Sequence, residues 1–113
     1  MNLNKKSFME LMRKITKKNT LEKFNIIIWH GDSAIYKNAL YIELMFTINN
    51  NCYVQSVSEE EELNLYYGEE LEDTKDNLKI IYKQAKDFRR KIKTWINGTW
   101  LKDIEIVIQE ENI

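Results

Sequence analysis

The strongest constraint on the fold is a set of apolar residues that recurs every three or four positions between residues 78 and 95. Its members are Leu78, Ile81, Ala85, Phe88, Ile92 and Trp95. This spacing places one apolar face along a helix of about five turns. Asp73 or Thr74 can cap its start, and Gly98 suits the left-handed residue that ends many helices. A helix with one long apolar face needs a second layer to cover it.

Strand patterns supply that layer. Residues 24–30 are rich in β-branched and aromatic side chains, and residues 104–109 alternate between apolar and polar. Between residues 39 and 48 every even position is apolar, namely Leu40, Ile42, Leu44, Phe46 and Ile48. A period of two is typical of a strand with one apolar face. The run Asn49-Asn50-Asn51 predicts a tight turn into a return strand over residues 52–57.

The chain begins with a second helical pattern. Phe8, Leu11, Met12 and Ile15 recur at helical spacing, and Ser7 followed by Glu10 matches a capping box with Ser7 as N-cap. Together the patterns predict one α+β domain over residues 1–113. We expect an antiparallel sheet of three to four strands, with an N-terminal helix and a long helix packed on one face.

Composition excludes several classes of protein. Cys52 is the only cysteine, so no internal disulfide is expected, and the sequence predicts neither a metal site nor a cofactor site. The N-terminal residues lack the apolar core of a secretory signal, and no apolar run is long enough to span a membrane. We therefore expect a cytoplasmic protein. Lys, Asn and Ile, whose codons are AT-rich, supply 41 residues, which fits a bacterial host cell.

No catalytic motif is present. His30, Asp32 and Cys52 are the only residues that could form a nucleophile–base–orienter triad, and no family signature surrounds them. We interpret His30 as a residue with a structural role and Cys52 as a small buried hydrophobic residue. Strand alternation predicts Glu43 on the solvent face, with a paired buried acid as the alternative. We expect a protein that is not an enzyme.

Charge is strongly segregated although the net charge is only −1. Residues 59–76, called the acidic segment here, carry nine acidic residues and one basic residue. Residues 77–102 carry eight basic residues and one acidic residue. Five of these cations form one stripe of the long helix, called the basic stripe: Lys79, Lys83, Lys86, Arg90 and Lys93.

The acidic segment allows two interpretations. It can be a solvated loop, or a short helix capped by Ser58, whose carboxylates pair with the basic stripe. Alternatively, it can present a surface that mimics nucleic-acid phosphate to a cationic groove. Tyr66 and Tyr67 lie inside the segment, and tyrosine is frequent at interface hot spots. These rings either contact a partner or tie the segment to the core.

The layout resembles small anti-CRISPR proteins, which are Cas nuclease inhibitors of phages and mobile elements. One such group opens with Met-Asn-Ile-Asn and an amphipathic helix, followed by three short antiparallel strands that run into an acidic stretch. Here Met1-Asn2-Leu3-Asn4 opens the chain, and residues 53–59 (YVQSVSE) run into the acidic segment. This chain differs from that group by its longer basic helix and its additional C-terminal strand.

The resemblance implies a protein–protein interaction in which an acidic surface fills the groove where the nuclease reads duplex DNA. The implied partner-binding residues are Glu59, Glu60, Glu61, Glu62, Tyr66, Tyr67, Glu69, Glu70, Glu72, Asp73 and Asp76. Two other functions remain open. One is an immunity or antitoxin protein that neutralises a basic toxin nuclease through the same surface. The other is a small nucleic-acid-binding module that uses the basic stripe of residues 75–97.

Overall fold

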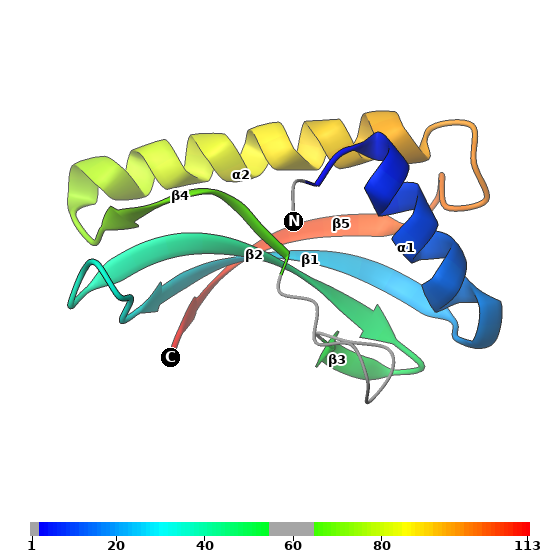
Figure 1. Cartoon of the computed structure of the whole chain (residues 1–113), viewed down its shortest axis with the longest axis horizontal. Helices are drawn as coiled ribbons and strands as arrows, with labels where there is room; N and C mark the ends of the chain where they lie inside the picture. The colour runs from blue at the N-terminus through cyan, green and yellow to red at the C-terminus, as the bar shows by residue number, and fades with distance from the viewer. Residues whose placement is uncertain (1–2, 55–64) are drawn as a thin grey trace.

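The computed structural model describes residues 3–54 and 65–113. Its elements follow the order α1 (Lys5–Lys18), β1 (Leu21–Gly31), β2 (Ala39–Ile48), β3 (Asn51–Val54), β4 (Leu65–Glu72), α2 (Lys75–Ile96) and β5 (Glu105–Asn112). In Figure 1, α2 runs along the length of the sheet and α1 crosses one end of it. The predicted α+β class is confirmed.

Strand β2 contacts three other strands. It pairs with β1 along one edge over its whole length. Its other edge is shared, since residues 39–44 pair with β4 and residues 46–48 pair with β3. All of these pairings are antiparallel, whereas β5 lies parallel to β1 on the far side of the sheet.

In the described part of the chain, the sheet has more strands than the predicted three to four, and one of its four pairings is parallel. The described residues form five strands, and the sheet is mixed because β5 is parallel to β1. Strand β4 is antiparallel to β2 and therefore runs in the same direction as β1 and β5. Helix α2 thus connects two parallel strands. Such a crossover carries the chain back to its starting end, so the next strand must run parallel to the first.

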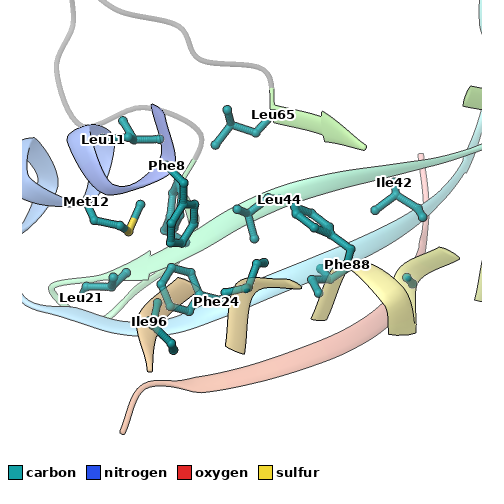
Figure 2. Close-up of a cluster of buried hydrophobic side chains, with 14 of the residues drawn as sticks. Phe8, Leu11, Met12, Leu21, Phe24, Ile42, Leu44, Leu65, Phe88 and Ile96 are labelled. Carbon is teal, nitrogen blue, oxygen red and sulfur yellow. The ribbon is translucent and has the colours of Figure 1, made fainter. Parts of the chain in front are cut away.

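The main core lies between the helices and one face of the sheet (Figure 2). The even-numbered residues of β2 are buried there, as the alternation predicted. On α2 the predicted residues Ile81, Ala85, Phe88 and Ile92 are buried, while Leu78 is only partly buried. All five cations of the basic stripe are exposed. The apolar and basic faces of α2 therefore lie where the sequence predicts.

The helix ends differ in part from the prediction. Helix α1 begins at Lys5 with Asn4 as its N-cap, so the predicted capping role of Ser7 was wrong. Ser7 is instead the third helical residue: its amide donates to Asn4 Oδ1 at 2.9 Å, and its Oγ accepts from the Asn4 amide at 3.1 Å. Asn4 and Ser7 thus form a capping box whose N-cap lies about one turn before the predicted one. Thr74 caps α2, and Gly98 follows it with a φ of 77°.

The opposite face of the sheet is also closed over its centre. Ile27 is 0% exposed and Glu43 is 3% exposed, so the predicted solvent position of Glu43 was wrong. Glu43 Oε1 accepts a hydrogen bond from Trp29 Nε1 at 2.9 Å, which matches the alternative of a paired buried acid. The Tyr53 hydroxyl donates to Gln109, the register partner of Ile27. Side chains therefore cover a face that strand alternation alone assigned to solvent.

The turn after β2 has the predicted left-handed residues, since Asn49 and Asn50 have φ values of 50° and 67°. Strand β3 covers Asn51–Val54, and the predicted continuation to residue 57 lies outside the described residues. Cys52 is exposed, so its predicted burial was wrong. The reason is that β3 is short and leaves residues 51–53 open to solvent at the edge of the sheet.

Candidate partner-binding surface

Most of the described part of the acidic segment is a strand, and not the loop or short helix that one interpretation predicted. Residues 65–72 form β4, and the predicted sites Glu59, Glu60, Glu61 and Glu62, with the proposed cap Ser58, lie outside the described residues. Tyr67 pairs with Ile42 and Leu71 pairs with Leu40, so three residues of β4 oppose one residue of β2. This bulge begins at Gly68, whose φ is 74°. Bulges protect exposed strand edges from further pairing.

Gly68 has a second reason to lack a side chain. A Cβ atom added there would lie 2.8 Å from the Gln84 side-chain oxygen of α2. The bulge therefore brings β4 close to α2 and holds Glu69 and Glu70 at the outer edge.

The carboxylates of β4 are available for a partner. Glu69 and Glu72 are exposed, and Glu70 is half-buried. Within the described residues these three side chains form no ion pair, and the basic stripe does not reach them. Asp76 is exposed in the first turn of α2, where a negative charge is favoured by the helix dipole. The expected pairing between acidic segment and basic stripe is thus not found here.

The two tyrosines have different environments. The Tyr67 ring stacks on Phe88 with 4.2 Å between centroids and 2° between planes, and its hydroxyl donates to Asp87 Oδ2 at 2.8 Å. Tyr67 therefore ties β4 to α2. Tyr66 is 53% exposed and packs edge to face with Tyr41, with 5.8 Å between the ring centroids. Of the two rings, Tyr66 is the one that a partner can reach.

A hollow of about 430 Å³ opens beside Tyr66 on the face of the sheet away from the helices. It lies between β4 and the turn after β1, and it is lined by Asp32, Ser33, Ala34, Tyr41, Tyr66, Gly68 and Glu70. Ser33 orders this turn, since its Oγ accepts from the Tyr36 amide at 2.9 Å and its amide donates to the Tyr36 carbonyl. The hollow combines two aromatic rings with two carboxylates.

Negative charge surrounds the inner ring of this hollow. Burial raises the pKa of the Tyr41 hydroxyl, and the nearby Tyr66, Glu43, Glu70 and Asp32 raise it further. Burial and then Glu43 also raise the pKa of Tyr66. Sequence reasoning did not assign Tyr41 or Glu43 to a site. The available signal was the aromatic and acidic character of the odd positions of β2, which alternation assigned to plain solvent exposure.

Asp73 has a structural contact of its own. His30 Nδ1 lies 2.8 Å from Asp73 Oδ2, and His30 Nε2 lies 2.9 Å from Glu110 Oε2. Tyr82 donates to the other oxygen of Glu110. Because both ring nitrogens face carboxylate oxygens, the doubly protonated imidazolium satisfies both contacts. The cluster joins β1, β5, the connection between β4 and α2, and α2 itself.

The charges in this cluster shift one another's titration. The hydrogen bond to Asp73 raises the pKa of His30, with partial burial opposing it and Glu110 assisting. The bonds from Tyr82 and then His30 lower the pKa of Glu110. Glu110 in turn raises the pKa of Tyr82 to about 12. These contacts support the structural interpretation of His30.

The triad of His30, Asp32 and Cys52 is not assembled. His30 pairs with Leu40 at one end of β2, whereas β3 pairs with the other end from Phe46 onward. Six residues of extended strand separate these positions, which is roughly 20 Å. Cys52 is therefore remote from the imidazole.

The basic stripe forms a separate surface on the outer side of α2. A shallow hollow of about 230 Å³ there is lined only by cations, namely Lys86, Arg89, Arg90 and Lys93. Arg90 also lies 3.6 Å from Asp87, but both side chains are largely exposed, so this pair contributes little.

Comparisons with protein-family models, with curated proteins and with solved structures find no match to the chain. Across residues 3–54 and 65–113, no three His, Cys, Asp or Glu side chains are grouped so as to hold a metal ion. In the same ranges neither helix combines the length and the apolar character needed to cross a membrane.

Proposed function

We propose that the protein is a non-enzymatic inhibitor that binds a nucleic-acid-processing effector, a CRISPR-associated nuclease, through the acidic surface of β4. The observation that carries this proposal is the set of unpaired carboxylates Glu69, Glu70 and Glu72 beside the exposed ring of Tyr66. Carboxylates that form no ion pair among residues 3–54 and 65–113 keep their charge available for a cationic groove. The aromatic ring offers an anchor of low conformational entropy.

The charge density of β4 sets the scale of the mimicry. Glu69 to Glu72 carries three negative charges and spans at most about 10 Å, because the bulge shortens this part of the strand. Duplex DNA carries about six charges over about 10 Å, counting both strands. The described part of the surface therefore offers at least about half the charge density of duplex DNA. Electrostatics should mainly accelerate association, and Tyr66 should mainly slow dissociation.

A DNA-cleavage assay tests the proposal with two variants of equal charge. The test variant is Glu69→Gln, Glu70→Gln and Glu72→Gln, and the control is Glu10→Gln, Asp103→Asn and Glu105→Gln. Each removes three negative charges, but only the first removes them from β4. Guide-loaded Cas nucleases are incubated with a matched DNA duplex and each protein, and the fraction of duplex cleaved is measured.

We expect the wild type and the control to block cleavage by a Cas effector, and the β4 variant to require at least tenfold more protein. Equal inhibition by the two variants would show that β4 is not the contact surface. If every Cas nuclease tested cleaves the duplex fully in the presence of the wild type, the proposal that the partner is a Cas nuclease is rejected. Protection from a basic toxin nuclease instead would identify an immunity protein that uses the same surface.

A second candidate function rests on the cation-lined hollow of α2. Lys86, Arg89, Arg90 and Lys93 can follow a phosphate backbone, as in many nucleic-acid-binding helices. The net charge of −1 and the unpaired acids of β4 oppose tight binding of duplex DNA. An electrophoretic shift at nanomolar protein with a steep salt dependence, abolished by Lys86→Gln with Arg90→Gln, would favour this function over inhibition.

A further inference from the structure

The hollow beside Tyr66 is a built pocket and not only a group of acids. Its inner wall is the ring of Tyr41, its outer wall is the ring of Tyr66, and the two rings meet edge to face at 76°. Its volume of about 430 Å³ falls within the range of small-ligand sites. Gly68 lines the β4 side of the pocket, and its missing side chain would point toward Gln84 of α2 and not into the pocket.

Carboxylates stand on both sides of these rings. Asp32 enters from the turn after β1, and Glu70 enters from β4. Neither forms an ion pair within the described residues. Glu43 lies on the same face as the two rings, 3% exposed and in register with Tyr66. Among the described residues, no Lys or Arg side chain lines the pocket. The site therefore combines two aromatic rings with the negative field of Asp32 and Glu70.

We propose that this pocket receives the guanidinium group of one arginine from the partner protein. The inference rests on the proposed function, because the pocket shares Tyr66 and Glu70 with the acidic surface of β4. A guanidinium is planar, stacks on a tyrosine face and binds a carboxylate through two parallel hydrogen bonds. A lysine ammonium is a point charge with a stronger hydration shell and gains less from the rings.

The position of the pocket agrees with an occupant that belongs to a larger molecule. It opens on the same edge as Glu69 and Tyr66, where the proposed interface lies. Nuclease grooves that read duplex DNA present arginine side chains to the major groove. An arginine that contacts phosphate or a base edge in the nuclease–DNA complex would contact Asp32, Glu70 and the two rings when the nuclease binds this protein. The pocket thus supplies selectivity that a dispersed set of carboxylates lacks.

Binding of a single-residue probe tests the pocket directly, without any nuclease. The isotope-labelled full chain is titrated by NMR with Nα-acetyl-arginine amide, with the lysine analogue and with the citrulline analogue, which keeps the shape but lacks the charge. We expect the arginine probe to shift the backbone signals of residues 32–34 and 66–70, citrulline to shift none of them, and lysine to bind at least threefold more weakly. Asp32→Asn and Glu70→Gln should each weaken the arginine probe about fivefold.

Matched controls separate pocket binding from general charge attraction. Glu105→Gln, at an exposed acid of β5, should leave probe binding unchanged. Equal shifts with citrulline, or equal weakening by Glu105→Gln, would overturn the proposal, as would tighter binding of lysine.

The cleavage assay distinguishes failure of the pocket from failure of the proposed function. Asp32→Asn should reduce inhibition of the nuclease about fivefold in parallel with probe affinity. Inhibition that survives Asp32→Asn unchanged would remove the arginine pocket and leave the acidic surface of β4 in place. Probe binding by a wild type that inhibits no nuclease would support the pocket and reject the nuclease as partner.

Discussion

Replacing Phe88 with alanine should destabilise the protein by about 4–5 kcal/mol. Phe88 is 0% exposed in the middle of α2, where it packs in the main core and stacks on the ring of Tyr67 of β4. Phenylalanine-to-alanine changes in a core cost about 3–5 kcal/mol through lost transfer energy and the cavity that remains. The stacked contact with Tyr67 adds roughly 0.5–1.5 kcal/mol beyond burial, which favours the upper half of the range.

Thermal and urea unfolding measure this loss. For 113 residues the unfolding entropy is about 240 cal/mol/K near the midpoint, so 4–5 kcal/mol lowers Tm by about 17–21 °C. A domain of this length has a total stability of roughly 6–17 kcal/mol, so the variant should remain foldable. The midpoint in urea should fall without a change in its slope.

Two other variants of α2 and the core provide the comparison. Ile80→Ala removes an apolar side chain that is 47% exposed on the same helix and should cost less than about 1 kcal/mol. Phe88→Leu keeps most of the apolar volume and should cost less than Phe88→Ala. A loss below about 1 kcal/mol for Phe88→Ala, or an equal loss for Ile80→Ala, would refute the placement of this helix face.

Three further outcomes are expected. Because the fold raises the pKa of His30, the protonated imidazole stabilises the fold below about pH 6.5, and this stabilisation is lost as pH rises through the raised pKa. Because the fold lowers the pKa of Glu110, the ionised carboxylate stabilises the fold above about pH 4.5. The Tm difference between wild type and His30→Gln should therefore be largest between these values and shrink toward pH 9; a pH-independent difference would contradict this. Tyr66→Ala should raise the dissociation rate from the partner at unchanged Tm, whereas Tyr67→Ala should lower Tm, and surface plasmon resonance with melting curves separates the two. Native Cys52 should react with a thiol reagent as fast as in the unfolded chain, and strong protection would contradict its exposure.

Much of the local structure follows from periodicity in the sequence. The apolar positions of α2 and the even positions of β2 face the core because helix and strand geometry dictate which residues share a face. The turn at Asn49 and Asn50 follows from the tolerance of asparagine for positive φ. The separation of charge into the acidic segment and the basic stripe likewise follows directly from the order of residues in the sequence. These features depend on neighbours within a few residues.

Strand β4 was missed because its local preferences oppose its conformation. Glutamate and glycine are depleted in strands, and residues 65–72 contain three glutamates and Gly68. Pairing with the open edge of β2 and the packing of Leu65 and Tyr67 against the core override that preference. The parallel direction of β5 was missed for a related reason, since it is imposed by the crossover through α2 and not by its own residues.

The candidate site divides in the same way. The sequence alone identifies Glu69, Glu70, Glu72 and Tyr66 as acidic and aromatic neighbours, because they are adjacent along the chain. Only the tertiary structure shows that Tyr67 is held by Phe88.

Contacts between distant segments form the rest of the site. The turn after β1 brings Asp32 to β4, and two distant segments of the chain contact His30 through Asp73 and Glu110. Glu43 is buried because side chains close over the second face of the sheet. Such contacts depend on how the sheet pairs and curves, and a pattern of period two holds no information on what covers each face.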